Sequence, residues 1–160
     1  MLKIQLICVG KMKEKYFLDA VEEYRKRLGA YCTLELTELD EIPRGKGASE
    51  ADIDAALRKE GARILERLPH PGTTAAMCVE GKQISSTDMA ELLKKCAGSG
   101  APRLTFLIGG SDGLHETVKA ASDLRISMSK MTFPHHLARV MLLEQIYRGF
   151  TILAGTKYHK

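Results

Sequence analysis

The sequence contains no tryptophan, and only five tyrosines and four phenylalanines occur among its 160 residues. Nothing in it approaches about 18 consecutive apolar residues, the length that a membrane-spanning helix needs, which excludes such a helix. The apolar stretch 1–10 is too short for the hydrophobic core of a secretory signal followed by a cleavage site, and charged residues come directly after it. We therefore expect no membrane partner.

Cysteine is also scarce, and its spacing excludes the usual cysteine sites. The four residues, Cys8, Cys32, Cys78 and Cys96, form no CxxC pair and match no zinc pattern. Cys8 and Cys78 lie in stretches that read as strands, where a free thiol serves as a small hydrophobic side chain. This usage favours a reducing, cytoplasmic location.

The composition is that of a globular protein, with 44% hydrophobic and 28% charged residues. A chain of this length buries enough surface to fold without a disulfide or a metal. We expect one domain over residues 1–160.

Positive charge is concentrated near the C-terminus. The chain carries 24 lysines and arginines against 20 aspartates and glutamates, a net charge of +4. The whole excess lies within residues 120–160, which hold six basic and two acidic residues and three of the five histidines. A local positive field suits a polyanion such as nucleic acid, and a mildly basic solvated surface is the alternative that charge leaves open.

Hydrophobic periodicity predicts strands and helices in alternation. Strands are expected at 2–9, 32–39, 74–80, 103–108 and 124–128, and helices at 14–29, from Ser49 to about Leu68, after Ser86, at about 114–122 and from Pro134 to about Leu153. This order predicts an α/β fold, a mainly parallel sheet flanked by helices. Ligands of such sheets bind at the carboxyl ends of the strands, here after Val9, Glu80, Ile108 and Met128.

The sharpest local signal is LTFLIGGSDG, a buried strand that enters a glycine turn at Gly109. Glycines allow positive φ and close approach of a ligand. The dinucleotide motif GxGxxG would need glycine where the chain has Ile108, and the Gly-Lys-Ser/Thr of a phosphate-binding loop is absent. An adenosine-like ligand without a pyrophosphate fits this loop, and a tight turn without a ligand is the alternative.

A second loop, SMSKMTFP, spans residues 127–134 and is rich in hydroxyls, thioethers and backbone amides. Its backbone groups could bind the edge of an adenine while Met128, Met131 and Phe133 cover the faces of the ring. A hydrophobic turn whose methionines fill gaps in the core is the alternative.

The last helix carries a charged pair on an otherwise apolar face. Glu144 and Arg148 are spaced i,i+4 beside Leu137, Val140 and Met141. Burial of such a pair in a monomer core is costly, so the pair suits a subunit interface or a polar site. A position at the wet edge of the apolar stripe is the other interpretation.

Three further features concern ligands of this region. Arg139 is expected on the opposite helix face, free to meet a phosphate. His135 and His136 are not followed by a ligand one turn later, so no metal is expected. The terminal residues 156–160, TKYHK, could stack on a base and hold phosphates, although a chain terminus usually frays.

Taken together, FLIGGSDGL, SMSKMTFPHHLARVMLLEQIYRGF and the terminal YHK closely resemble the RlmH family of SPOUT methyltransferases. Length and element order match throughout, and the specific motifs lie in the C-terminal 55 residues. The resemblance implies an α/β knot fold, with a deep trefoil knot in the part at about 100–160 that binds the cofactor. Element order alone could not predict a knot, because threaded chains are very rare.

The resemblance also implies an activity: methylation, by S-adenosylmethionine, of N3 of pseudouridine 1915 in 23S rRNA of the assembled ribosome. It implies a homodimer that shares its active sites. By resemblance, the catalytic residues are Glu144, Arg148, Tyr158 and His159. The residues expected to contact RNA, from their charge and position, are Arg139, Lys157 and Lys160. The cofactor contacts are Met77, Gly109, Met128, Ser129, Lys130, Met131, Thr132 and Phe133.

Two rival functions remain open from the sequence. A ribosome-binding or RNA-binding protein without catalysis would rely on the basic region alone. A knotted methyltransferase with another RNA target would bind the cofactor but leave this pseudouridine unmodified. Because aromatic side chains are few, recognition of RNA shape is expected to outweigh base stacking.

Overall fold

The computed structural model describes residues 1–160, and strands and helices alternate along the whole chain. The strands are β1 (Lys3–Val9), β2 (Thr33–Leu39), β3 (Thr73–Gln83), β4 (Arg103–Ile108) and β5 (Leu124–Ser127). The helices are α1 (Lys15–Leu28), α2 (Glu50–Leu65), α3 (Ser86–Ala97), α4 (Glu116–Ala121) and α5 (His135–Leu153). The predicted order is confirmed. β3 runs beyond its expected end to Gln83, and α2 ends before the expected Leu68.

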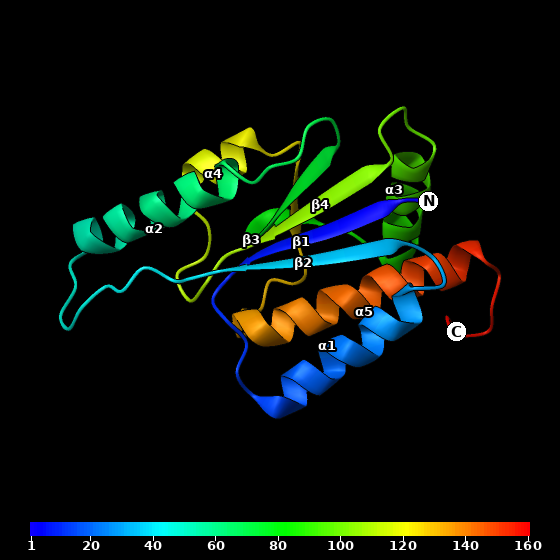
Figure 1. Ribbon diagram of the computed structural model, residues 1–160, viewed down its shortest axis with the longest axis horizontal. Helices are drawn as coiled ribbons and strands as arrows, with labels where there is room; N and C mark the ends of the chain where they lie inside the picture. The colour runs from blue at the N-terminus through cyan, green and yellow to red at the C-terminus, as the bar shows by residue number, and fades with distance from the viewer.

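The five strands form one sheet in the order β2-β1-β4-β3-β5, and every neighbouring pair is parallel (Figure 1). This confirms the expected parallel sheet. Because all strands run the same way, their carboxyl ends meet at one edge. The loops after β3, β4 and β5 therefore lie close together, although they are far apart in the sequence.

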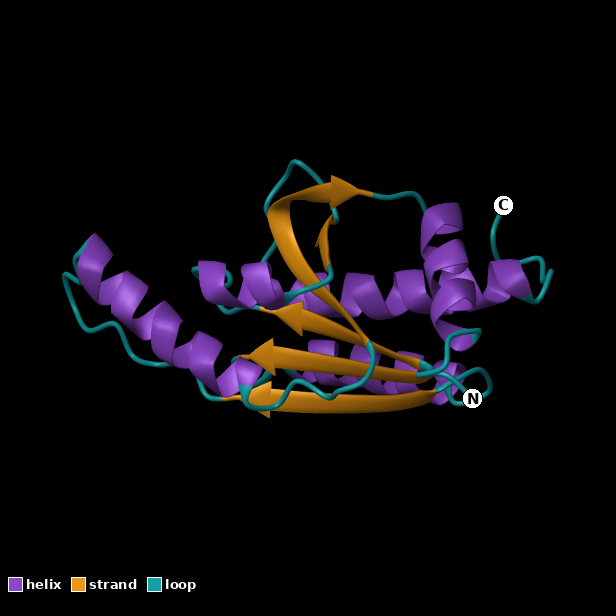
Figure 2. Ribbon diagram, turned by 90° about the horizontal axis from the view of Figure 1, so that it is seen from above, coloured by secondary structure: helices purple, strands orange, loops and turns teal.

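Helices cover both faces of the sheet, with α1 and α5 on one side and α2 and α4 on the other (Figures 1 and 2). Alternation along β1 explains the two layers, since successive side chains of a strand point to opposite faces. Ile4, Leu6 and Cys8 belong to the larger core with α1, α3 and α5. Ile7 and Val9 belong to the smaller core with α2 and α4.

The remaining predictions about the fold have mixed outcomes. The helix expected from Ser49 begins there, and Ser49 caps α2 in a capping box with Asp52. All four cysteines are free thiols. None of the helices is both long and apolar enough to cross a membrane. The trefoil knot and the single domain over residues 1–160 stay predictions.

Candidate active site

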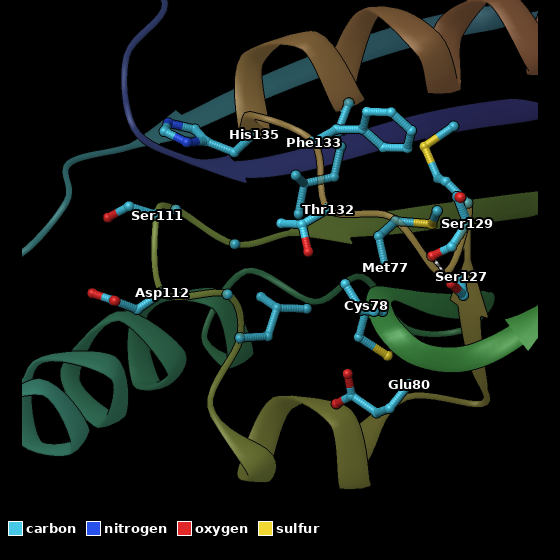
Figure 3. A pocket seen from close by; sticks show the side chains of 18 of the residues that line it. Met77, Cys78, Glu80, Ser111, Asp112, Ser127, Ser129, Thr132, Phe133 and His135 are labelled. Carbon is cyan, nitrogen blue, oxygen red and sulfur yellow. Dashed lines mark hydrogen bonds between the residues drawn. The ribbon is translucent and has the colours of Figure 1, made fainter. Parts of the chain in front are cut away.

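A cleft with a volume of about 360 Å³ opens at the carboxyl edge of the sheet (Figure 3). Three segments supply most of its lining: 77–80 of β3, 108–114 after β4, and 127–133 after β5. Two of these segments begin at the ends of β4 and β5, as the sequence indicates, whereas the third lies within β3, which runs on to Gln83. The loop after the remaining strand, β1, does not line this cleft. Its residues Gly10 and Lys11 line a separate cavity.

The glycine loop folds tightly on itself. The N–H of Gly113 donates to the carbonyl oxygen of Gly110 at 3.1 Å, and Gly113 has a φ of +78°. A Cβ added at Gly109 would overlap the carbonyl oxygen of Gly113. Glycine is therefore required at position 109 by the loop's own backbone.

Side chains from outside the cleft hold this loop in place. The hydroxyl of Ser111 donates to Glu41 Oε1 at 2.7 Å, and this hydrogen bond is the main cause that lowers the pKa of the Glu41 carboxyl. Arg44 binds Asp112 at 2.9 Å and Glu60 of α2 at 2.7 Å. The conformation of the glycine loop thus depends on the β2–α2 connection.

The Arg44–Glu60 pair allows a test of stability. Glu60 is only 2% exposed, so Arg44→Met leaves a buried carboxylate without its cation. We expect the free energy of unfolding to fall by about 3 kcal/mol, measured by urea denaturation. The matched control is Arg58→Met, which breaks an exposed pair with Asp54 and should cost less than about 1 kcal/mol. Equal losses in the two variants would contradict the role of the buried pair.

The opposite side of the cleft is formed by a bend in β3, which curves out of the plane of the sheet (Figure 2). Its register against β5 shifts between Met77 and Lys82, and a Cβ at Gly81 would lie 2.7 Å from the backbone of Ile126. The bend turns Cys78 and Glu80 toward the cleft (Figure 3).

Two ionisable groups on this bend have shifted pKa values. Burial raises the pKa of the Cys78 thiol, which favours its protonated form. The hydrogen bond from Lys119 lowers the pKa of Glu80, and the two side chains form an ion pair at the edge of the cleft.

The loop 127–133 is shaped by its own serines. The buried Ser127 hydroxyl donates to the carbonyl oxygen of Ser129 at 2.9 Å, and Ser129 Oγ accepts from the N–H of Met131 at 3.0 Å. Phe133 is half-buried, whereas Met131 is 69% exposed. Beyond this loop, His135 faces the cleft, and burial lowers the pKa of its imidazole.

A second group of functional candidates lies on α5 and the C-terminal tail. Glu144 Oε1 accepts hydrogen bonds from Arg148, at 2.6 and 3.0 Å, and from the Tyr158 hydroxyl at 3.1 Å. The Arg148 guanidinium also lies over the Tyr158 ring, 4.7 Å from its centre, and 3.5 Å from His159 Nδ1. The four residues therefore form one cluster, although none of them lines the cleft of its own chain.

The structure brings together most of the residues named from the sequence. Seven of the eight expected cofactor contacts line the cleft: Met77, Gly109, Met128, Ser129, Met131, Thr132 and Phe133. The eighth, Lys130, is exposed and does not line it. Fourteen further residues line the cleft that were not predicted as cofactor contacts: Cys78, Val79, Glu80, Ile108, Gly110, Ser111, Asp112, Gly113, Leu114, Lys119, Ser127, His135, Ala138 and Leu142. Most of these residues lie in or next to the glycine loop and the loop 127–134, but no sequence pattern predicts that Lys119 belongs to the cleft.

The prediction that Arg139 is free to meet a phosphate is wrong. Its side chain is 3% exposed, and it donates to Glu38 at 2.5 Å and to the carbonyl oxygen of Gly10 at 3.0 Å. It is a structural residue that ties α5 to the ends of β1 and β2. The exposed cations without a protein partner in the basic region are Lys130, Lys157 and Lys160.

A mostly apolar cleft at the carboxyl edge of a parallel sheet is the place where α/β proteins bind small ligands, and here a glycine turn bounds it. A family model described as "Predicted SPOUT methyltransferase" matches residues 2–159. The chain therefore belongs to the SPOUT methyltransferase family and is a methyltransferase. It is 46% identical, over 159 residues, to a protein of Clostridium beijerinckii named ribosomal RNA large subunit methyltransferase H; the match covers 99% of this chain and 100% of that protein.

Proposed function

We propose that the protein methylates N3 of pseudouridine 1915 in 23S rRNA of the assembled ribosome, with S-adenosylmethionine as the donor. The observation that carries the proposal is the cleft formed by the glycine loop and residues 127–133, which belong to the stretches that carry the family resemblance. The name of the Clostridium beijerinckii relative supports a large-subunit rRNA target. We also propose a cytoplasmic location, where ribosomes are found.

The residues of the cleft fit this donor. Met77, Leu114 and Met128 offer apolar surface to a purine, and the glycine loop offers backbone amides and carbonyls at close approach. Ser129 and Thr132 add hydroxyls for polar groups. When bound, S-adenosylmethionine supplies an electrophilic methyl group on a sulfonium. A single nucleoside in the cleft also agrees with the absence of a GxGxxG motif for a dinucleotide.

The cluster on α5 and the tail supplies the other half of the active site. Glu144 Oε1 is fully engaged with Arg148 and Tyr158, so we assign this oxygen the role of holding those two side chains. His159 is exposed, and its Nε2 makes no hydrogen bond within the chain. We assign proton acceptance from the imide N3 to His159, and stabilisation of the resulting anion to Arg148.

The active enzyme is proposed to be a homodimer. Residues 154–160 do not line the cleft of their own chain, because the tail turns back onto α5 through Tyr158. In a dimer, the tail of one subunit, still held to its own α5 by Glu144, would close the cleft of its partner, with Lys157 and Lys160 toward the RNA. This arrangement would unite the two halves of the active site.

Methyl transfer to defined RNAs tests the proposed function. Purified protein would be incubated with labelled donor and with ribosomes, naked 23S rRNA or tRNA, and the modified nucleoside would be identified by mass spectrometry. We expect 3-methylpseudouridine from ribosomes at one position. Methylation of tRNA or of a 2′-hydroxyl would support another knotted methyltransferase. RNA binding without heat on titration of the donor would support a protein without catalysis.

A further inference from the structure

A second cavity, of about 330 Å³, adjoins the cleft on the side of α3 and α5. The two cavities share Met77, Ser127, Met128 and Leu142 in their walls. Flexible methionine side chains therefore form much of the partition, and such side chains can adapt to ligands on either side. A ligand in the second cavity would lie directly beside a donor bound in the cleft.

One wall of this second cavity is a polar chain of three residues. The Ser86 hydroxyl donates to Gln145 Oε1 at 2.7 Å, and Gln145 Nε2 donates to Glu144 Oε2 at 2.8 Å. Because Ser86 occupies the carbonyl oxygen of the Gln145 amide, the orientation of that amide is fixed, with its NH2 group toward Glu144. All three side chains line the cavity.

In the hydrogen bond between Gln145 and Glu144, each of the two side chains keeps one unused hydrogen-bonding position. The Gln145 NH2 group has two N–H donors, and one of them is used by Glu144. Glu144 Oε2 accepts one hydrogen bond and has a second lone pair, whereas Oε1 is occupied by Arg148 and Tyr158. The wall thus presents an acceptor beside a donor in a cavity that is also lined by the apolar side chains of Met77, Met89 and Ile126.

We propose that this second cavity is the subsite for the target base. Glu144, oriented by Gln145, selects pseudouridine over uridine by accepting a hydrogen bond from its N1–H, and Gln145 donates to its C2 carbonyl oxygen. The inference rests on the proposed function. In pseudouridine the sugar is attached to carbon, so N1 carries a hydrogen next to the C2 carbonyl. In uridine N1 carries the sugar and cannot donate.

This pairing also leaves the reacting atom free. N3 lies on the other side of the C2 carbonyl, so a base held through N1–H and O2 keeps N3 away from Glu144 and available to the donor. Methyl transfer must occur in line with the bond that breaks, which requires this exposure of N3. Met89 and Met141 would cover the ring.

The selectivity of Gln145→Met tests the proposal. Single-turnover rates would be measured with excess enzyme on ribosomes that carry either pseudouridine or uridine at the target position. Wild-type protein should prefer pseudouridine. Gln145→Met should slow both reactions, because uridine presents its C4 carbonyl at the same place, but it should slow the pseudouridine reaction roughly tenfold more, because it also releases Glu144 Oε2, the acceptor of N1–H. A merely structural role would slow both reactions equally, and that result would overturn the proposal. The matched control is Gln83→Met, at an exposed position that lines neither cavity, which should leave the preference unchanged.

Methyl-labelled methionines locate the base without any substitution. Met131 lines only the cleft, Met89 and Met141 line only the second cavity, and Met1 and Met12 line neither. In NMR spectra of donor-saturated protein, pseudouridine should shift the Met89 and Met141 signals, and N1-methylpseudouridine should not. The proposal is overturned if pseudouridine leaves both signals unchanged, or if the donor alone moves them. Activity of wild-type protein on ribosomes would remain a separate result, so a failure of this inference is distinguishable from a failure of the proposed function.

Discussion

Deletion of Tyr158–Lys160 is expected to lower methyl transfer to ribosomes by roughly a hundredfold or more, since it removes the proposed proton acceptor His159 together with Tyr158 and Lys160. The fold should survive. Within the chain, the tail makes one hydrogen bond to Glu144, stacks Tyr158 against Arg148 and packs against the edge of Tyr147. Removing these interactions should lower the free energy of unfolding by about 2 kcal/mol or less. Single-turnover rates and urea denaturation measure the two effects, and wild-type rates from the truncated protein would refute the role of the tail.

The tail also allows a test of which subunit it serves. Truncated protomers with an intact cleft would be mixed with full-length protomers whose cleft is disabled by Gly109→Ala. If the tail closes the partner's cleft, mixed dimers contain one complete active site and activity returns. If the tail serves its own chain, no mixed dimer has a complete site, and the mixture stays inactive.

Gly109→Ala is expected to reduce affinity for S-adenosylmethionine by roughly a hundredfold or more. The added Cβ would overlap the carbonyl oxygen of Gly113 and lie 2.8 Å from its Cα, so the turn must open. Because both atoms belong to backbone, no side-chain rotation relieves the contact, and overpacking of this kind costs about 1–3 kcal/mol in stability as well. Calorimetric titration of the donor measures the affinity.

Gly100→Ala is the matched control for this substitution. A Cβ at Gly100 would meet nothing within 4 Å, and this glycine lies in the connection before β4, outside the cleft. It should bind the donor as the wild type does. Normal affinity in Gly109→Ala would show that the glycine loop does not shape the donor site.

Much of the fold was predictable because the signals are local. The alternation of strands and helices follows from hydrophobic periodicity, and the parallel sheet follows from that alternation. Ser49 as a helix cap and Gly109 as part of a tight turn are likewise read from neighbouring residues. In the same way, two loops recognised by their composition, around Gly109 and Met128, meet in the cleft because parallel strands share one carboxyl edge.

Predictions that depended on the surroundings of a single side chain were less successful. A helical wheel places Arg139 opposite the apolar stripe, but it does not show that Glu38 and the carbonyl of Gly10 lie against that opposite face. Lys119 carries no sequence signal, because only the bend in β3 brings Glu80 to it. The second cavity was missed for a related reason, since it joins residues of α3 and α5 that are far apart along the chain, such as Ser86 and Gln145.

The sequence by itself determined the order of the elements, the parallel sheet, the two loops that line the cleft and the spacing of Glu144 and Arg148, since all of these depend on residues close together along the chain. Tertiary structure decided which charged side chains are free and which are paired, as with Arg139 and Lys130. It also decided that Ser86 and Gln145 meet beside the cleft. The physical reason is that burial and ion pairing depend on which elements pack together across the sheet, and local propensity does not encode that packing.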